Sequence, residues 1–569
     1  MHRPGFNVKD SPVVRFLRLL PRGLAFFLVG LYAKVFLRPK FVDLRFLYAV
    51  SGPALLLANR TSLIDPLILA LRSPARLTFA LDETWAKTFW VSVIKSRAKV
   101  IPINRDKPVG PQGVRDALDK GEVVVLFPEA LFTTHGSNMK ISEEVGVFAI
   151  DADVPTLPVI FDGPQHSRFG MVRLHVKNAP RKAPIKVTIF APRKLDFPER
   201  ENEPAIARTK RAATAVYEIF HEHGFWAKDF DKNLWTALED AAKLYGKNRV
   251  ILEDADRKPM TYREIIRDSK RYAFHLESLS KPGENVGIML PNCVYNVLSL
   301  FGLWCLGRVP VILNFTQGAV LVNAAIRTAL VKTVVTSRRF AKQSGLEKLL
   351  VELNARIVYV EDFKFPFAVK WNAFRRKPTP TPHDAPGVIV FTSGSEGSPK
   401  GVQHSHRSLF SNNHQTTRHL DYSEDDVLFD PMPMFHTIGL NMLMLMPLLQ
   451  GMYTFLYLSP LHAHTIPELL YELGVTMVVA SDTFANAWAR EGHPRDFSTL
   501  RILLCGSERI KEKTHEKFLK EFGVRIYEGY GVSEAAPVLA VSSQMNYRLG
   551  ACGNFLPGIK TKLTPVDGI

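Results

Sequence analysis

Short apolar runs alternate with amphipathic stretches along most of the chain. Before residue 225, four runs have the length and composition of buried strands: Ala54–Ala58, Val123–Phe127, Leu157–Phe161 and Ile185–Ile189. Helical stretches lie between them, and residues 208–224 have the pattern of a closing helix. Strands that alternate with helices are typical of α/β domains. We therefore expect an α/β domain over residues 41–225.

A second α/β region begins near residue 234, and its predicted strands end abruptly in loops of small residues. Val388–Phe391 precedes Thr392-Ser-Gly, Ile502–Leu504 precedes Cys505-Gly-Ser, and Val524–Tyr527 precedes Glu528-Gly-Tyr-Gly. In open parallel sheets, ligands bind where strands deliver such loops. Three loops of this kind predict one shared ligand site within residues 234–569.

The first 40 residues form a basic segment with an apolar centre. They hold eight basic residues against one acid, Asp10, and residues 23–33 carry no charge. The apolar stretch is too short to span a bilayer, which takes about 20 residues. We interpret residues 1–40 as a basic helix in the membrane interface. The alternative is a helix that packs on the core of the first domain.

Residues 364–386 interrupt the second region with a basic, aromatic insertion. Phe367, Trp371 and Phe374 follow the spacing of one helix face, with Lys370 and Arg375 beside them. This pattern fits an amphipathic helix on a lipid surface. It fits equally a packed surface helix that is followed by a stiff, proline-rich linker.

The overall charge limits the classes of binding partner, and the cysteine content limits the kinds of covalent and metal crosslink that the chain can contain. The net charge is +18 and the pI is near 9.6, which suits a phospholipid surface, a nucleic acid or an acidic carrier protein. No zinc-finger spacing or RNA-binding motif occurs, so we do not expect nucleic acid as a partner. The four cysteines are far apart, which argues against a disulfide framework and a zinc site.

The loop after Val388–Phe391 carries candidate nucleotide chemistry. Its small and hydroxyl residues are Thr392, Ser393, Gly394, Ser395 and Gly397. Glycines let backbone N–H groups approach an anion, hydroxyls add donors, and Lys400 adds a positive charge. The loop is not a Walker A motif, because Pro399 stands where that motif has its second glycine.

The eleven residues from Phe391 to Gly401 resemble the signature of the adenylate-forming superfamily of acyl-CoA and acyl-carrier-protein synthetases. Pro433–His436, Gly506–Glu508 and Tyr527–Glu534 resemble further motifs of that family in the same order. The resemblance implies ATP and Mg²⁺ as cofactors and the large N-terminal domain of the adenylate-forming fold. By this resemblance, His436 lies beside the carboxylate, and Gly506, Ser507 and Glu508 surround the adenine. Tyr530, which is flanked by Gly529 and Gly531, stacks on the adenine ring. Ser533 contacts the phosphate and Glu534 binds Mg²⁺.

Adenylation explains why such a site needs these groups. A fatty-acid carboxylate must attack the α-phosphate of ATP, and two anions repel each other unless the site neutralises and aligns them. The adenylate then reacts with a thiol. Members of the family complete this site with a smaller C-terminal lid domain. No segment of the sequence up to Ile569 resembles that lid. We therefore expect the chain by itself to form acyl-adenylate poorly.

The first domain resembles the glycerophospholipid acyltransferases. Four segments carry the resemblance, in order: Asn59-Arg-Thr-Ser-Leu-Ile-Asp65, Ile101–Arg105, Phe127-Pro-Glu-Ala130 and Val154–Pro158. The resemblance implies catalytic positions at 60, Asp65 and Glu129, and substrate contacts at Arg105 and Pro158. The family has a histidine at the position of Arg60.

Arg60 is a poor replacement for a catalytic histidine. An arginine keeps its proton at neutral pH and has no lone pair to accept another. We therefore predict that the acyltransferase half is impaired, and that Arg60 pairs with Asp65 or binds a phosphate. His135 and His166 are alternative bases, although neither has the motif spacing.

The domain order, acyltransferase before adenylate-forming, resembles the bacterial bifunctional acyl-ACP synthetase/2-acylglycerophosphoethanolamine acyltransferases. That resemblance implies a fatty acid, acyl carrier protein or CoA, a lysophospholipid and the membrane surface as partners. It places the chain at the cytoplasmic face of the inner membrane. The alternatives are a long-chain fatty acid–CoA ligase with a decayed acyltransferase domain, and a non-catalytic, membrane-bound lipid or nucleotide binder.

Overall fold

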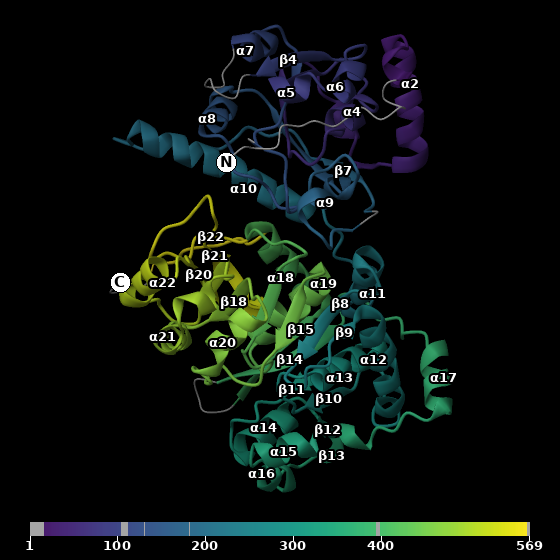
Figure 1. Cartoon of the computed structure of the whole chain (residues 1–569), viewed down its shortest axis with the longest axis vertical. Helices are drawn as coiled ribbons and strands as arrows, with labels where there is room; N and C mark the ends of the chain where they lie inside the picture. The colour runs from purple at the N-terminus through teal and green to yellow at the C-terminus, as the bar shows by residue number, and fades with distance from the viewer. Residues whose placement is uncertain (1–15, 104–111, 130, 181–182, 394–398, 566–569) are drawn as a thin grey trace. The chain divides into compact units, whose positions relative to one another are not determined.

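The computed structural model describes residues 16–103, 112–129, 131–180, 183–393 and 399–565. Its contacts divide the chain into two compact units, Met1–Ala227 and Lys228–Ile569. In both units, largely parallel sheets carry helices on their faces (Figure 1). The predicted α/β fold class is confirmed. Among the described residues, no helix is long and apolar enough to cross a membrane.

The described part of the first unit contains one seven-stranded sheet, in the order β1-β7-β6-β2-β5-β3-β4. Its strands are β1 (Lys40–Val42), β2 (Ala54–Ala58), β3 (Thr78–Asp82), β4 (Lys99–Ile103), β5 (Val123–Leu126), β6 (Thr156–Asp162) and β7 (Lys186–Ile189). All neighbours are parallel except β6 and β7. The central strand β2 is buried at all five positions, as its unbroken apolar run predicts for a parallel sheet.

Helices of the first unit connect these strands. They are α2 (Arg22–Tyr32), α3 (Arg45–Tyr48), α4 (Asp65–Ala70), α5 (Glu83–Ala86), α6 (Phe89–Ile94), α7 (Gln112–Asp119), α8 (Glu143–Asp151), α9 (Val172–His175) and α10 (Ala205–Trp226), with the π-helix η1 (Ala33–Leu37) and the 3₁₀ turn η2 (Pro164–His166). The predicted closing helix is confirmed as α10. Gly146 of α8 permits its tight contact with α10, because a Cβ there would lie 2.6 Å from the backbone of Ala213.

Two further sheets form the described part of the second unit. One has the order β13-β12-β10-β11-β14-β15 and the other β22-β21-β20-β19-β18-β16-β17-β8-β9. The strands are β8 (Val250–Asp254), β9 (Met260–Thr261), β10 (Asn285–Ile288), β11 (Val309–Ile312), β12 (Thr333–Thr336), β13 (Arg356–Tyr359), β14 (Pro386–Ser393), β15 (Pro399–Ser405), β16 (Val427–Asp430), β17 (Tyr453–Leu456), β18 (Met477–Ala480), β19 (Ile502–Cys505), β20 (Ile526–Gly531), β21 (Val538–Val541) and β22 (Asn554–Phe555).

Helices cover both sheets of the second unit. They are α11 (Leu234–Tyr245), α12 (Tyr262–Glu277), α13 (Val294–Cys305), α14 (Ala319–Thr328), α15 (Arg338–Gln343), α16 (Glu347–Val351), α17 (Phe367–Arg375), α18 (His406–His419), α19 (Met446–Gln450), α20 (Thr465–Glu472), α21 (Asp482–Glu491) and α22 (Glu512–Glu521), with the π-helix η4 (Ile438–Leu445) and the short 3₁₀ turns η3 (Val360–Asp362), η5 (Pro494–Phe497) and η6 (Ser533–Ala535). A capping box of Thr261 and Glu264 starts α12.

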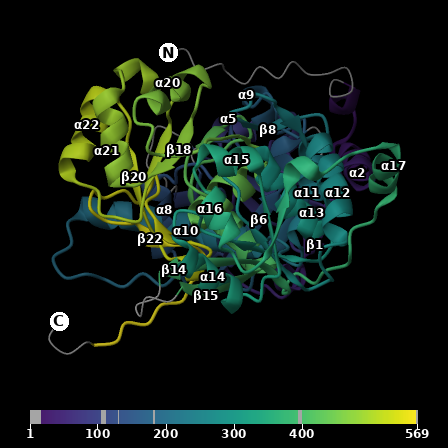
Figure 2. The same ribbon diagram turned by 90° about the horizontal axis from the view of Figure 1, so that it is seen from below.

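Side-chain alternation divides the core around the nine-stranded sheet. Met477 and Leu504 belong to the cluster that includes residues of η4, whereas Val478 and Leu503 belong to the cluster with α20, α21 and α22. Successive residues of a strand point to opposite faces, so this division follows from the sequence of β18 and β19. Figures 1 and 2 show α20, α21 and α22 grouped on one side, away from α11, α12 and α13.

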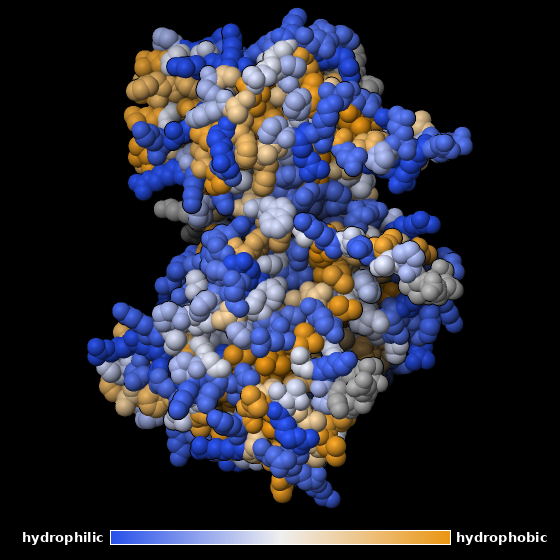
Figure 3. Space-filling model, turned by 180° about the vertical axis from the view of Figure 1, so that it is seen from behind, coloured by the Kyte–Doolittle hydropathy of each residue, from blue (hydrophilic) through white to orange (hydrophobic). Residues whose placement is uncertain are grey.

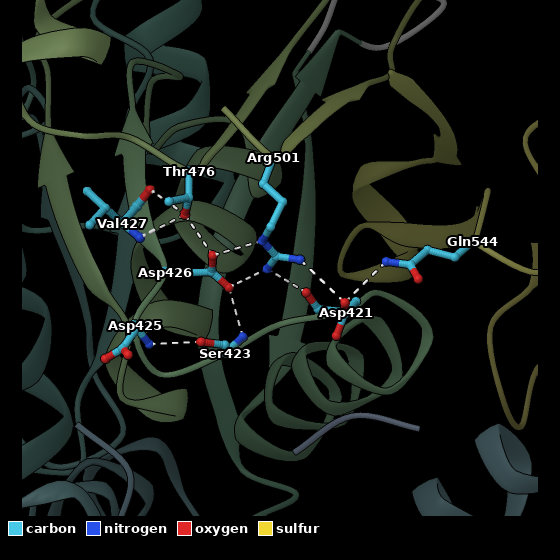
Figure 4. Close-up of polar contacts among 8 residues, drawn as sticks. All are labelled: Asp421, Ser423, Asp425, Asp426, Val427, Thr476, Arg501 and Gln544. Carbon is cyan, nitrogen blue, oxygen red and sulfur yellow. Dashed lines mark hydrogen bonds and ion pairs between the residues drawn. The ribbon is translucent and has the colours of Figure 1, made fainter. Parts of the chain in front are cut away.

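A polar network joins the starts of three central strands (Figure 4). The guanidinium of Arg501 lies 2.6 Å from the carboxylate of Asp426, which is 4% exposed. The hydroxyl of Thr476 donates to Asp426 at 2.7 Å and accepts from the backbone N–H of Val427 at 3.0 Å. These residues come directly before or at the beginning of β16, β18 and β19. The network therefore holds the register of the sheet at the edge opposite its carboxyl-terminal loops.

Candidate functional sites

Loops from the carboxyl ends of the central strands meet at one cavity of the second unit. The cavity has a volume of about 310 Å³. Among its lining residues are seven of the predicted site residues: His436, Gly506, Ser507, Gly529, Tyr530, Gly531 and Ser533. The structure thus brings three separate motifs together at the edge where parallel sheets bind ligands.

Two glycines let these loops approach each other. A Cβ on Gly506 would lie 3.1 Å from the carbonyl oxygen of Gly529, so the two loops touch through their backbones. A Cβ on Gly531 would lie only 2.2 Å from the carbonyl oxygen of Pro537. No side chain fits at Gly531 unless the backbone moves, which explains the glycine in the motif in steric terms.

The end of β20 and the turn that follows it present groups suited to a nucleotide and a metal. The ring of Tyr530 is 51% exposed and available for stacking. His404 holds the next turn in place, because its Nε2 lies 2.8 Å from the carbonyl oxygen of Ser533. The neighbouring Glu534 is exposed, and carboxylate oxygens are ligands that Mg²⁺ prefers. These residues therefore fit the cofactors that the motif implies.

The predicted phosphate loop joins β14 to β15. Thr392 lies opposite Lys400 and Ser393 opposite Pro399 in the antiparallel pairing, and Lys400 is exposed. Gly394, Ser395 and Gly397 lie outside the described residues. The pairing places the two ends of the loop side by side, as a hairpin turn requires.

Glu508 lies away from the cavity lining and binds the start of α21. Its carboxylate accepts the backbone N–H of Thr483 at 2.7 Å and the hydroxyl of the same residue at 3.1 Å. Hydrogen bonds from Ser481 and Thr483 hold the pKa of Glu508 below its ordinary value. In this arrangement Glu508 positions the loop of Gly506 and Ser507.

His436 lies between two cavities. Besides the first cavity, it lines a second one of about 750 Å³, whose polar lining includes Asp256, Arg339 and His462. Burial lowers the pKa of His436, so the imidazole is neutral at physiological pH. The second cavity therefore also borders His436, which no motif in the sequence indicated.

Part of the first cavity's lining is apolar, and we call its residues Met442, Val479 and Leu504 the floor. Met442, Val479 and Leu504 line both this cavity and a small space of about 10 Å³ beyond it. Met446 and Met477 line only the small space. Methionine side chains are unbranched and adapt to irregular gaps. Sequence reasoning missed this floor, because its residues come from ordinary apolar runs.

In the first unit, the acyltransferase-like motif forms a buried turn between β2 and α4. The carboxylate of Asp65 accepts the backbone N–H groups of Thr61 and Ser62, both at 2.7 Å, and the hydroxyls of both residues. Burial raises the pKa of Asp65 to about 6. Asn59 bonds the backbone of Phe161 in both directions, at 3.0 and 2.7 Å, and so ties the turn to β6.

Arg60 is enclosed by the protein. Its guanidinium forms an ion pair with Asp82, and the two side chains are 4% and 8% exposed. Its charged end also lies 3.9 Å from the ring centre of Phe132 and 4.6 Å from that of Trp85. The expected pair of Arg60 with Asp65 is thus replaced by a pair with Asp82, and Asp65 is occupied by Thr61 and Ser62.

Glu129 is bonded to the backbone of the same turn between β2 and α4. Its carboxylate accepts the backbone N–H of Arg60 and, at 2.6 Å, that of Met139. Burial raises the pKa of Glu129 to about 8. Pro158 is buried in β6, paired with Leu57 of β2. The predicted substrate contact Arg105 lies outside the described residues.

The alternative base His166 lies near this turn. The loop that contains Thr133 and Gly136 bonds the carbonyl oxygen of Arg60 through the N–H of Thr133. A Cβ on Gly136 would lie 3.9 Å from the ring of His166. The loop therefore connects the surroundings of Arg60 with His166.

Two family models match the chain, one in each of its two units. Residues 238–568 match the model of the AMP-binding enzyme family, and residues 38–162 match that of the acyltransferases. A long-chain-fatty-acid–CoA ligase of Escherichia coli O157:H7 is 24% identical over 351 residues, which cover 54% of this chain and 62% of the relative. A 4-coumarate–CoA ligase of Solanum tuberosum is 24% identical over a region that covers 56% of this chain and 61% of that relative.

Solved structures show the same fold. The structure of an anthranilate CoA ligase in complex with anthranoyl-AMP matches with a TM-score of 0.51 and 20% identity, over 59% of this chain and 65% of that one. The chain spans about 61% of the length of the first curated relatives that it matches. With its family match over residues 238–568, the chain belongs to the AMP-binding enzyme family, and an acyltransferase domain precedes its AMP-binding domain.

Proposed function

We propose that the chain activates a long-chain fatty acid with ATP and passes the acyl group to a thiol. The observation that carries this proposal is the cavity at His436, whose rim of backbone and hydroxyl groups adjoins a floor of Met442, Val479 and Leu504. A polar rim suits the carboxylate and the phosphates. An apolar floor suits an alkyl chain, whose burial stabilises binding by about 0.8 kcal/mol per CH₂ group.

The residues in and around the cavity have two roles: they align the carboxylate with ATP, and they offset the negative charge of the two reactants. In the activation step, a carboxylate oxygen bonds to the α-phosphorus and the bond to pyrophosphate breaks. The exposed ring of Tyr530 and the loop at Gly506 hold the base, while Lys400 and the carboxylate of Glu534 lie on loops that can reach the phosphates and the metal. Mg²⁺, when bound, offsets the charge of the phosphates. The neutral imidazole of His436 can donate a hydrogen bond to the carboxylate without holding it in an ion pair.

Calorimetry tests the nucleotide site. We expect ATP with Mg²⁺ to bind the chain, and the double variant Lys400→Ala/Glu534→Ala to bind it at least about tenfold more weakly, because both charged partners are lost. The matched control is Lys377→Ala, which removes an exposed lysine of the same unit. Equal affinity of the site variant and the wild type would remove the assignment.

The acceptor thiol is a second part of the proposal. We propose acyl carrier protein as the acceptor, because the net charge of +18 favours an acidic protein. CoA is the competing acceptor, as the name of the Escherichia coli relative indicates for that protein. Acyl transfer with both thiols, each supplied at equal concentration and with a related C-terminal lid domain added, decides between them. Transfer to CoA alone would identify CoA as the acceptor, and binding without any transfer even with the added lid domain would support the non-catalytic reading.

For the acyltransferase domain, we propose that reacylation of a lysophospholipid is impaired by Arg60. A guanidinium that is buried against Asp82 cannot take a proton from a lysophospholipid hydroxyl. In the variant Arg60→His, the rate of acyl transfer from preformed acyl-acyl carrier protein to lysophosphatidylethanolamine should rise by about 100-fold, which is within the range of general-base catalysis. His166→Ala serves as a control for the alternative base. Equal, substantial activity of the wild type and Arg60→His would refute the proposal.

We also propose that the first unit binds the cytoplasmic face of the inner membrane through α2. Ala25 and Val29 of this helix are buried, whereas Phe27 is 65% and Leu31 49% exposed. Figure 3 shows hydrophobic atoms gathered at the upper left, where α2 lies. Arg22 and Lys34 accompany them. Binding to vesicles with anionic lipid should fall as salt is added, and equal binding to neutral vesicles would contradict this assignment.

A further inference from the structure

The helix α17 presents an aromatic ridge to solvent. Phe367, Trp371 and Phe374 are 79%, 52% and 81% exposed. Their rings stack in sequence, with centres 6.4 Å apart for the first pair and 6.2 Å for the second. Large apolar side chains that form a continuous exposed patch mark an interaction surface, whereas single exposed ones are ordinary.

The ridge is held in place by the rest of the second unit. α17 packs against α12, and the buried residues of α17 are Val369 and Ala373, which lie one turn apart. Before the helix, Phe363 stacks on His275 of α12 with ring centres 4.8 Å apart. After it, Arg376 makes two bonds to Glu277 at the end of α12, at 3.1 and 2.6 Å. The aromatic face is therefore a fixed feature of the domain surface.

Positive charges flank the ridge. Lys370 and Arg375 lie on the helix itself, Lys364 and Lys377 lie just outside its two ends, and all four side chains are exposed. Residues 364–377 contain no aspartate or glutamate. Figures 1 and 3 show α17 at the periphery of the unit, with hydrophobic and hydrophilic atoms side by side on it. A short helix with aromatic residues on one face and cations beside them fits the boundary between lipid headgroups and acyl chains.

We propose that α17 is a membrane-docking site of the AMP-binding domain, whose partner is a bilayer surface that contains anionic phospholipid. The nine residues of α17 measure about 13 Å, so the helix lies in the interface and does not cross it. The three rings enter the headgroup region and the cations meet lipid phosphates. This contact belongs to the second unit and does not depend on α2 or on which thiol accepts the acyl group.

Vesicle binding of the full chain tests the site. The vesicles contain phosphatidylglycerol and phosphatidylcholine, and the background variant Phe27→Ser/Leu31→Ser weakens the other proposed contact. In that background, Phe367→Ser/Trp371→Ser/Phe374→Ser should lower the partition coefficient at least about tenfold, because the apolar contact is lost. The matched control is Val320→Ser/Val351→Ser, which removes two side chains that are 80% and 87% exposed elsewhere in the same unit. Equal binding of the triple variant and the control would overturn the proposal.

A second measurement reports insertion directly and needs no loss of binding. Brominated lipids should quench tryptophan fluorescence of the wild type, and Trp371→Phe should lose most of that quenching while it still binds. Undiminished quenching in Trp371→Phe would show that this ring does not reach the lipid. Lys370→Gln/Arg375→Gln should reduce the salt dependence of binding. Aromatic side chains and cations also bind single-stranded nucleic acid, so an oligonucleotide that binds through the same ridge, with no vesicle binding, would refute the membrane assignment.

Discussion

The buried pair of Arg60 and Asp82 gives a prediction whose magnitude follows from the structure. Removing one partner of a buried ion pair costs about 3–5 kcal/mol. For Arg60→Met we expect a loss near the lower end, about 3 kcal/mol, because Asp82 keeps two other donors, the hydroxyl of Thr84 and the backbone N–H of Trp85. The lost contacts of the guanidinium with two rings add about 1 kcal/mol.

The same pair predicts strong coupling between the two positions. Asp82→Asn alone leaves the guanidinium buried without its anion and should cost about 3 kcal/mol. In the double variant Arg60→Met/Asp82→Asn no charge is left behind. We therefore expect a total loss of about 4–5 kcal/mol, which is about 2–3 kcal/mol less than the sum of the single losses, about 4 kcal/mol and about 3 kcal/mol.

Hydrogen exchange of the full chain, followed by mass spectrometry, measures these losses locally. Peptides that cover β2, α4 and α5 should exchange about 100-fold faster in Asp82→Asn and about 700-fold faster in Arg60→Met, since about 1.4 kcal/mol corresponds to a factor of ten. Peptides of the second unit serve as the internal control. Strictly additive losses, or unchanged exchange in Arg60→Met, would refute the view that Arg60 is a structural partner of Asp82.

Three further predictions concern the two sites. Met446→Ala should shift acyl preference, measured by competition among saturated fatty acids, toward longer chains, because it enlarges the space beyond the cavity; an unchanged preference would place the chain end elsewhere. Gly531→Ala should weaken ATP binding in calorimetry at least about tenfold, whereas Gly318→Ala, where a Cβ meets nothing within 4 Å, should not. The pKa of Glu129 is raised to about 8 by burial, so the folded state holds a proton that the unfolded chain releases above about pH 4.5, and stability falls as the pH rises between these values. Glu129→Gln should therefore lose less stability between pH 5 and pH 8 in urea titrations than the wild type, and equal losses would contradict the raised pKa.

Local sequence was sufficient wherever a feature depends on neighbouring residues along the chain. The run Ala54–Ala58 forms β2 over the same residues, because a short unbroken apolar run suits a strand that is buried on both faces of a parallel sheet. Phe367, Trp371 and Phe374 share one helix face by their spacing alone. The motifs around Gly506 and Gly531 were recognisable by their resemblance to the adenylate-forming family, and the structure adds the steric reason for both glycines.

Tertiary structure alone decided which distant groups meet. Met442, Val479 and Leu504 form one floor only because η4, β18 and β19 contribute side chains to the same apolar cluster, and no local pattern distinguishes these residues from other core residues. The partner of Arg60 is Asp82, which lies 22 positions away, while the nearby Asp65 is already filled by backbone and hydroxyl donors. Sequence thus determined the fold class, the sheet-edge loops and the chemistry they carry. Packing determined the shape of the apolar floor and the partner of the buried Arg60 guanidinium, because both depend on contacts between residues that are far apart in the sequence.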